Sequence, residues 1–335
     1  MARDQRAYSM SRRSFCWTLA GILAAPVIAT GQPPRIRRIG VLEPSTGPST
    51  PDDLTQAEAL RQLGWVEGRN LHVERRFANG RPEALQPLAE ELVRAHVEII
   101  VTGGTAATLA AKRATATIPI VFRSAGDPVL LVLVASLARP GGNVTGFSKI
   151  TPEVTLKYIS VLQELLPGLQ RIGVLLQVGN PYDRAVRAQF ERVCQSLGLA
   201  PIAVEISEPS AIGDAIGQLE RKHAQALVLG SATGFFWEHR FEIVGIATKH
   251  GLPTMVDDTA MVREAGALIA YGYLQMEEDR VRAENIDRIL RGAKPADLPV
   301  QQPTKFELVI SLKTAKLLGL TIPQSLLLRA DEVIQ

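Results

Sequence analysis

Hydrophobic positions along the chain fall into short apolar runs that alternate with longer segments of helical periodicity. In the first half, the short runs predict strands at residues 37–43, 71–77, 97–103, 118–124 and 143–148. The longer segments between them predict helices at residues 51–64, 81–95, 105–115 and 127–142. This alternation is typical of βαβ units, which build a parallel sheet with helices on its faces.

The same alternation starts again at Thr151. It predicts helices at residues 151–168, 181–198, 210–223 and 235–251, and strands at residues 171–178, 201–207, 226–232 and 252–258. The pentapeptide RIGVL opens both halves, at residues 38–42 and 171–175, and each copy leads into a loop rich in turn residues. We therefore predict an α/β protein with two doubly wound, Rossmann-like lobes and a central cleft.

Residues 267–310 continue after the second lobe is complete. They predict a strand at 267–273, a helix at 276–292 and a further strand at 298–310. If the helix returns to the first lobe, the chain crosses between the lobes several times and forms a hinge. The expected domains are lobe 1 at residues 36–146 with about 274–297, lobe 2 at residues 147–273 with about 298–310, and a packed C-terminal tail at residues 311–335.

The N-terminal residues 1–29 have the pattern of an export signal. Arg12 and Arg13 precede an apolar run of about fourteen residues, which is short for a bilayer core of about 30 Å. Cleavage after Ala29 is therefore preferred over a permanent anchor, and Met10 is an alternative start. The segment is similar to a twin-arginine signal, so we expect the mature chain in the periplasm and not embedded in the membrane.

Composition excludes several classes of partner. Without residues 1–29, the chain holds 33 basic and 33 acidic residues, so it has no charge excess that would favour nucleic acid or an anionic membrane. Removal of the signal also removes Cys16, which leaves Cys194 alone and excludes an internal disulfide. Cys194 has helical spacing from Phe190 and Leu197, which favours a packed position over a reactive thiol.

Candidate ligand-binding residues lie where the predicted strands end, because loops and helix N-termini meet at the carboxyl edge of a parallel sheet. They are Glu43, Ser45, Thr46, Gly104, Thr105, Ala106, Ser124, Asp127, Asn180, Phe235, Phe236, Asp258 and Tyr271. Glu43 directly follows an apolar strand, where burial of a charge requires a partner, so it is expected to contact the ligand or the hinge.

Some of these candidates have two interpretations. In the segment TGGT at residues 102–105, Thr105 is expected to cap the next helix, and the glycines either let backbone N–H groups hold a carboxylate or only turn the chain. Asp127 precedes Pro128 and is either a helix N-cap or a ligand contact. Asp258, which follows Asp257 at a strand end, either holds an ammonium group or caps a short helix.

The densest aromatic cluster lies at residues 235–237 and also has two interpretations. Phe235, Phe236 and Trp237 stack on a flat ligand, or they pack in the core, since adjacent residues of a helix cannot all face one direction. Either interpretation places them at the start of a helix beside a strand end.

No pattern typical of catalysis or of a bound cofactor occurs in the sequence. The glycines at residues 103–104 do not belong to a G-x-G-x-x-G motif, and the P-loop, H-E-x-x-H and G-x-S-x-G patterns are absent. The five histidines are scattered. We therefore expect no catalytic residue, no metal and no cofactor, and an enzyme is the least favoured of three function classes.

Five segments are similar to the ABC transporter substrate-binding protein family, which includes tryptophan- and tyrosine-type members. They lie at residues 38–45, 60–93, 118–129, 136–148 and 289–334, and they include LRQLGWVEGRN and LLGLTIPQSLLLRADEVI. The resemblance implies a type I periplasmic-binding-protein fold, whose two lobes close on a small molecule. It also implies two partners, an ABC permease and its ATPase.

Carried over residue by residue, the ligand loops of the family correspond to Glu43–Thr46, Gly104–Ala106, Ser124–Asp127 and the loop that holds Phe235 and Phe236. This last loop begins with GSATG and lacks the expected Pro- or Asp-rich sequence, so the resemblance leaves the ligand open. The expected function is the capture of an amino acid or another small carboxylate-bearing solute by a monomer. The alternative is an exported sensor that signals to a membrane receptor.

Overall fold

The computed structural model describes residues 36–335, except residues 46, 48–50, 126, 150–151 and 231–233. The side chains of residues 51–54, 124–125, 152 and 275 are also outside the description. Residues Ile36–Gln335 form one compact unit, whereas the predicted export signal and its cut after Ala29 lie outside the described residues. Across the described ranges, no helix has both the length and the apolar character needed to cross a membrane.

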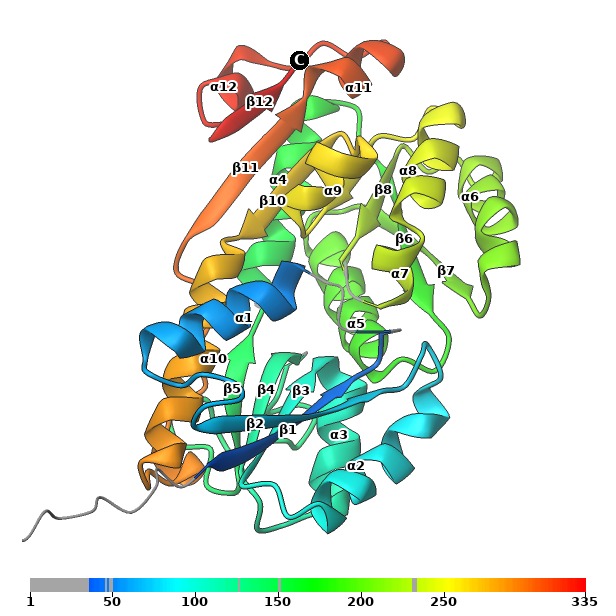
Figure 1. Cartoon of the computed structure of the whole chain (residues 1–335). Coiled ribbons are helices and arrows are strands. Elements are labelled where there is room, and N and C mark those ends of the chain that lie inside the picture. Colours follow the sequence, from blue (N-terminus) through cyan, green and yellow to red (C-terminus); the bar gives the residue numbers. More distant parts are fainter. Residues whose placement is uncertain (1–35, 46, 48–50, 126, 150–151, 231–233) are drawn as a thin grey trace, which may run out of the picture. The chain divides into compact units, whose positions relative to one another are not determined.

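The first half of the chain forms a parallel sheet, which we call sheet A (Figure 1). Its strands run in the order β2-β1-β3-β4-β5, with β1 at Arg37–Glu43, β2 at Leu71–Phe77, β3 at Ile99–Gly103, β4 at Ile120–Ala125 and β5 at Val144–Ser148. Apolar contacts place α2 (Leu85–Arg94) and α3 (Gly104–Ala114) on one face, and α1 (Pro51–Gln62) and α10 (Gln275–Leu290) on the other. Because both faces are covered, β3 and β5 are buried at every position.

The second half forms sheet B, in the order β12-β11-β10-β9-β8-β6-β7. Its strands are β6 (Arg171–Gln177), β7 (Ala200–Ile206), β8 (Ala226–Leu229), β9 (Thr254–Val256), β10 (Ile269–Tyr273), β11 (Phe306–Ser311) and β12 (Glu332–Ile334). All neighbouring pairs are parallel except β10 and β11. The two sheets confirm the predicted α/β class with two doubly wound lobes.

Helices cover both faces of sheet B as well. One face packs on α4 (Pro152–Leu165) and α5 (Pro181–Ser196), and residues of α11 (Leu312–Leu317) and α12 (Gln324–Leu327) join the same core. The other face packs on α6 (Ile212–Arg221), α7 (Phe235–Glu238), α8 (Arg240–Lys249) and α9 (Thr259–Ala265). Short 3-10 helices occur at Pro82–Ala84, Pro209–Ala211 and Pro295–Asp297.

The chain passes between the two sheets at three places, from β5 to α4, from β10 to α10, and from α10 to β11. In the third crossing, the Gln301 N–H donates to the Gly146 carbonyl (3.0 Å) and the Ser148 N–H donates to the Gln301 carbonyl (2.9 Å). This crossing therefore runs beside β5, where the first crossing begins. Grouped crossings of this kind are the usual form of a hinge between lobes.

The helix predicted at residues 127–142 is wrong, because this segment consists of turns. Pro128 is buried, but Leu130 and Val132 are 60% and 74% exposed. The Lys112 ammonium donates hydrogen bonds to the carbonyls of Val132 and Leu133. These two carbonyls therefore do not accept the backbone hydrogen bonds of a helix. The segment is almost uniformly apolar, and such runs carry no helical periodicity of their own.

Two other boundaries differ from the prediction. Residues 298–305, expected to begin the last strand, are irregular up to Phe306 and contain Pro303, which has no N–H for a ladder. The single helix predicted at residues 235–251 is two helices, α7 and α8, which meet at His239. The helix α9 was foreseen only as a short helix that Asp258 would cap.

Candidate ligand-binding site

A cavity lies between sheet A and sheet B. Four of the predicted residues line it, Thr105 and Ala106 from sheet A and Asn180 and Phe235 from sheet B. The other lining residues are Pro44, Gly80, Pro82, Leu85, Gly103, Gln177, Val178, Gly179, Pro181, Tyr182, Gly234 and Glu238. The cavity therefore has a wall from each sheet.

The wall from sheet A contains the N-terminus of α3. Gly103 is the N-cap residue and Gly104, the first residue of the helix, has φ +76°, a conformation that favours glycine. The prediction that Thr105 caps this helix is wrong, because Thr105 is its second residue and is 2% exposed. Glycine at the N-cap has no side chain to bond the first N–H groups of the helix, which suits them to an anionic ligand oxygen.

The wall from sheet B contains the N-terminus of α5. Asn180 is the N-cap, and its Oδ1 accepts a hydrogen bond from the Tyr182 N–H (3.0 Å). Asp183 is 1% exposed; its Oδ2 accepts from the Gln177 N–H (2.6 Å), and within the described structure its Oδ1 has no partner. Burial raises the pKa of Asp183 to about 7, and the nearby Asp257 carboxylate adds to this effect.

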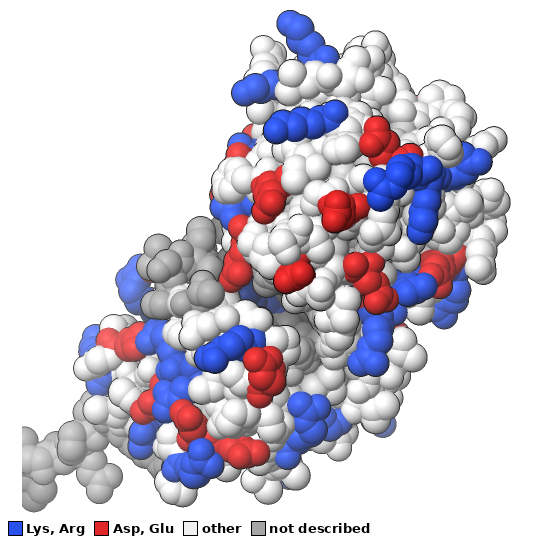
Figure 2. Space-filling model, turned by 90° about the vertical axis from the view of Figure 1, so that its right-hand side faces the viewer, with Lys and Arg blue, Asp and Glu red and all other residues white. Residues whose placement is uncertain are grey.

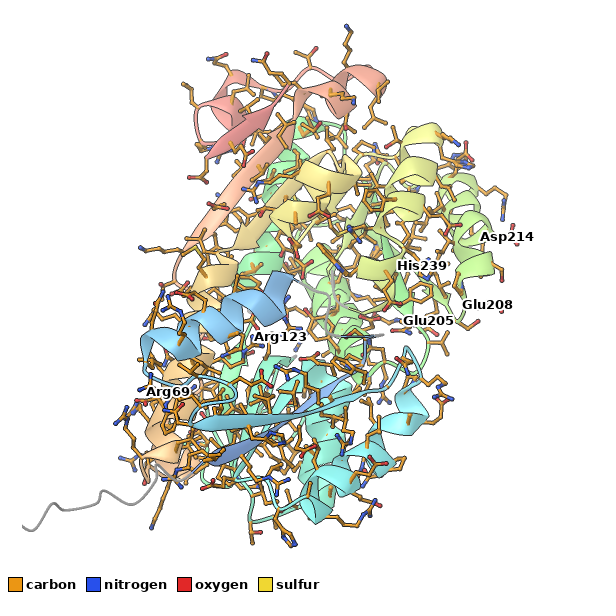
Figure 3. The ribbon with its side chains drawn as sticks, in the orientation of Figure 1. Arg69, Arg123, Glu205, Glu208, Asp214 and His239 are labelled. Atoms are coloured by element: carbon orange, nitrogen blue, oxygen red, sulfur yellow. The ribbon has the colours of Figure 1, made fainter. Side chains whose placement is uncertain are left out.

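Glu43 lies at the carboxyl end of β1, next to the cavity. It is 8% exposed, and its Oε2 lies 3.6 Å from Nη2 of Arg123 on β4. A Cβ atom added to Gly103 would stand 1.7 Å from the same oxygen, so the carboxylate rests directly on the glycine. Figure 3 shows Arg123 at this edge of sheet A. The partner that a buried Glu43 requires is therefore a charged residue of the same sheet, on a strand separated from β1 by β3.

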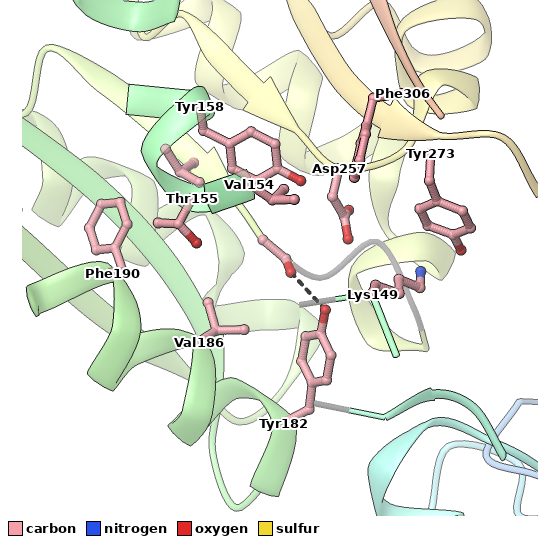
Figure 4. Close-up of a pocket in the computed structure, with 12 residues that line it drawn as sticks. Lys149, Val154, Thr155, Tyr158, Tyr182, Val186, Phe190, Asp257, Tyr273 and Phe306 are labelled. Carbon is pink, nitrogen blue, oxygen red and sulfur yellow. Dashed lines mark hydrogen bonds between the residues drawn. The ribbon is translucent and has the colours of Figure 1, made fainter. Parts of the chain in front are cut away.

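A second, smaller cavity lies beside the chain crossings (Figure 4). Tyr182 lines both cavities, and its hydroxyl donates to the Gly230 carbonyl (3.1 Å). The remaining lining residues come from sheet B, its helices and the crossings; they are Lys149, Val154, Thr155, Tyr158, Val186, Phe190, Val228, Asp257, Tyr273 and Phe306.

Aromatic rings support the second cavity. Tyr271, a predicted ligand residue, stacks on Phe306 with ring centres 5.2 Å apart and meets Tyr158 edge-on at 6.3 Å, so it stands against two lining residues. Burial, and next the Asp257 charge, raise the pKa of Tyr158 and of Tyr182 well above the ordinary value of 10.0. Both phenols are therefore neutral at physiological pH and can act as hydrogen-bond donors.

The other predicted residues lie apart from the cavities. Phe236 is 1% exposed, packs in the core of sheet B and meets the Phe235 ring edge-on at 5.5 Å. Asp258 caps α9, since its Oδ1 accepts from the Ala260 N–H (2.8 Å). Asp127 is exposed and accepts from the Val129 and Leu130 N–H groups, so it stabilises a turn rather than a helix.

Three predicted residues remain at the edge of sheet A. The Ser45 carbonyl accepts a hydrogen bond from the Asn79 N–H (3.1 Å). Thr46 and the side chain of Ser124 lie outside the described residues. Sequence reasoning did not single out Arg123 and Lys149, although each is a charged residue within or directly after a buried strand, the same signal that identified Glu43.

Charge and metal chemistry add little to the site. Figure 2 shows a face on which Lys and Arg side chains lie next to Asp and Glu, without a broad area of one sign. Among the residues whose placement is described, no group of three or more His, Cys, Asp or Glu could hold a metal ion.

Residues 39–334 match the family described as ABC transporter substrate binding protein. The chain is 26% identical to the tyrosine-binding protein of Clostridioides difficile (strain R20291) over 274 residues, which cover 78% of this chain and 75% of that protein. A conserved domain protein from Vibrio cholerae has a similar structure, with a TM-score of 0.82 and 26% identity over 89% of this chain and 100% of that one.

A second solved structure, an ABC domain from Streptococcus pneumoniae in complex with L-Trp, has a TM-score of 0.81 and 25% identity, over 89% of this chain and 100% of that chain. The type I periplasmic-binding-protein fold implied by the sequence is thus confirmed. With a family match that spans nearly all of the described residues, the chain belongs to the ABC transporter substrate-binding protein family.

Proposed function

We propose that this protein is the exported solute-binding component of an ABC transporter, which captures a small organic solute between its two lobes and delivers it to a membrane permease. The observation that carries the proposal is the inter-sheet cavity, because its walls come from both sheets. A ligand that touches both lobes binds the closed arrangement more tightly and so shifts the protein toward it. The permease and its ATPase would then recognise the closed form.

The proposed ligand is an amino acid or another small carboxylate-bearing compound. The glycine-capped N-terminus of α3 offers backbone N–H groups to a carboxylate, and the half-buried Phe235 offers an aromatic surface. Relatives named for tyrosine binding and solved with L-Trp support the same class. We propose that the protein acts in the periplasm as a monomer after loss of residues 1–29.

The test is a thermal-shift screen of the chain without residues 1–29 against the amino acids and a set of small carboxylates, followed by calorimetry of each hit. A true ligand at about 100 times its Kd stabilises the protein by about 2.7 kcal/mol and raises Tm accordingly. Phe235→Ala should weaken binding about tenfold. Phe241→Ala, on the 56% exposed Phe241 of α8 outside the cavity, is the matched control and should leave binding unchanged.

A screen in which no compound raises Tm would argue against solute capture. Chemical conversion of a bound compound would argue for an enzyme instead. Equal weakening by the two phenylalanine variants would show that the inter-sheet cavity is not where the ligand binds.

A further inference from the structure

Two of the chain crossings meet at the first turn of α10. Strand β10 ends at Tyr273, and α10, which packs on sheet A, begins at Gln275. Strand β11 begins at Phe306, which pairs with Tyr273. The second and third crossings therefore leave sheet B side by side, next to the start of α10 (Figure 1). A rotation of one lobe against the other requires the backbone to turn at this point.

The third crossing is tied to lobe 1 along its first part. The Thr145 hydroxyl donates to the Leu298 carbonyl (2.7 Å), and the Val300 N–H donates to the Leu137 carbonyl (2.8 Å). Gln301 forms two backbone hydrogen bonds with β5, one through its N–H and one through its carbonyl. This part of the crossing is therefore expected to move with sheet A.

Glu277 extends the attachment as far as the start of β11. It is the third residue of α10 and is half-buried. Its carboxylate accepts hydrogen bonds from the Thr304 hydroxyl (2.5 Å), the Thr304 N–H (3.2 Å) and the Lys305 N–H (3.4 Å). Within the described part of the chain, the hydrogen bonds of residues 302–305 all go to this carboxylate. The crossing is thus held by lobe 1 up to the residue before β11.

The position of Glu277 in a charged helix does not by itself account for these bonds. An acidic residue in the first turn of a helix interacts favourably with the helix dipole, wherever its side chain points. The basic residue one turn further, Arg280, pairs with Glu284 instead (2.6 Å). The Glu277 carboxylate is directed away from the helix surface and toward a segment of the chain 27 residues later.

We propose that Glu277 is a positioning residue of the hinge, which restricts how freely the two lobes move apart. With Glu277 in place, the third crossing can turn only at the junction of Lys305 and Phe306. Without it, residues 302–305 become a free linker, and the turn spreads over all of them. A protein that populates more lobe arrangements spends less time in each, so a smaller fraction is ready to bind any one solute.

The experiment measures the distance between the lobes in the absence of any solute. Spin labels are attached to the chain without residues 1–29 through Glu90→Cys on α2 and Asp214→Cys on α6, both at exposed positions. The native Cys194 is 0% exposed and should not take the label. Double electron–electron resonance should give a narrow distance distribution, and the additional change Glu277→Ala should broaden it and add longer distances.

Hydrogen exchange measures the bonds themselves. In Glu277→Ala, the amides of Thr304 and Lys305 should exchange about fivefold faster or more, because each loses a carboxylate acceptor. Glu277→Gln keeps one side-chain oxygen that can accept, so it should restore part of the narrow distance distribution.

Glu284→Ala is the matched control. It removes the same type of side chain from the same helix, but the partner of Glu284 is Arg280 within that helix. This variant should leave the distance distribution unchanged. Melting curves establish that each variant is folded, and Glu277→Gln still tests the inference if Glu277→Ala does not fold.

The inference and the proposed function fail in different ways, because this experiment contains no solute. An unchanged distance distribution in Glu277→Ala would overturn the inference, even if the two amides exchange faster, and would leave solute capture intact. Equal broadening by Glu277→Ala and Glu284→Ala would also overturn it. A broadened distribution in Glu277→Ala alone would support the inference even if the screen found no solute.

Discussion

The two halves of the molecule repeat one scaffold but differ where their first strands end. Strands β1 and β6 carry the same pentapeptide RIGVL, and the neighbouring strands follow the same order, β2-β1-β3-β4 and β7-β6-β8-β9. The glycine of each copy meets a leucine of the second following helix, since a Cβ on Gly40 or Gly173 would lie 2.9 Å from Leu92 or Leu219. The repeated sequence thus occupies the same packing position in both lobes.

The strand ends differ in charge. Strand β1 ends on Glu43, which is ion-paired with Arg123 of the same sheet. Strand β6 ends on Gln177, whose N–H donates to Asp183, a buried acid without a basic partner among the described residues. The same scaffold therefore holds a compensated charge at the end of β1 and, behind the end of β6, a buried acid whose pKa is raised to about 7. The following variants test this difference.

Among these variants, Asp183→Asn should change the free energy of unfolding most, and it should do so only at high pH. The folded protein raises the pKa of Asp183 from 3.8 to about 7, so the fold favours the protonated form. The free energy of unfolding should therefore fall as pH rises from about 4 to about 7 and then stay level. The asparagine removes this loss, so at pH 8 the variant should be more stable by up to about 4 kcal/mol, and at pH 4 about equal to the wild type.

Denaturant unfolding at pH 4, 6 and 8 measures this difference. Asp214→Asn is the control, because Asp214 is exposed and is the third residue of α6, as Asp183 is of α5 (Figure 3). A pH dependence that is the same in wild type and Asp183→Asn would show that the acid is not the titrating group.

Glu43→Gln should give the next largest change in the free energy of unfolding. The variant keeps the size of the side chain but removes its charge from the buried pair with Arg123. Loss of one partner of a buried pair leaves the other charge poorly compensated, so we expect a loss of about 3 kcal/mol in the free energy of unfolding at pH 7. Urea unfolding followed by circular dichroism measures it.

Glu74→Gln is the control for this variant. Glu74, in the same sheet, pairs with Arg38 (3.1 Å), His72 (3.0 Å) and Arg76 (3.4 Å), all in positions more exposed to solvent than the Glu43–Arg123 pair. The control variant should cost less than about 1 kcal/mol. If both variants lost the same free energy of unfolding, burial would not make the Glu43–Arg123 pair stronger than an exposed pair. That result would contradict the proposed difference between the two strand ends.

Gly40→Ala and Gly173→Ala should give the smallest losses of stability, and the two losses should be equal. In each case, the added Cβ pushes against the end of a leucine side chain, which can move, so a loss of about 1–2 kcal/mol is expected. Gly213→Ala in α6, where the Cβ meets nothing within 4 Å, should stabilise the protein by up to about 1 kcal/mol. Thermal melts of the three variants compare them. A loss in only one of the two lobes would contradict a shared packing position.

Local signals in the sequence were sufficient for most of the scaffold. The apolar runs located most strands of both sheets to within a few residues, because a strand covered on both faces must be apolar throughout. The exceptions are β11, whose start was placed eight residues too early, and β12, which was expected only as part of a packed tail. The Asp258 cap of α9 was also foreseen, as one of two interpretations, since capping depends on the next two or three residues. The cap of α3 was misplaced by two residues, because Gly103 rather than Thr105 takes the cap position.

The tertiary structure decided what the local pattern left open. Residues 127–142 form turns, and Lys112, from α3, bonds the carbonyls of Val132 and Leu133. The partner of Glu43 lies on β4, 80 residues along the chain, and the wall of the second cavity joins Lys149, Asp257 and Tyr273 from separate segments.

The sequence by itself therefore determined the class of fold, its repeated halves and the edge of each sheet whose loops line the inter-sheet cavity. Only the tertiary structure decided which charges are paired, which are buried without a partner, and which side chains share a cavity. The physical reason is the distance along the chain over which each kind of interaction acts. Strand and cap signals act between residues a few positions apart, whereas burial and ion pairing depend on segments that come together only in the folded chain.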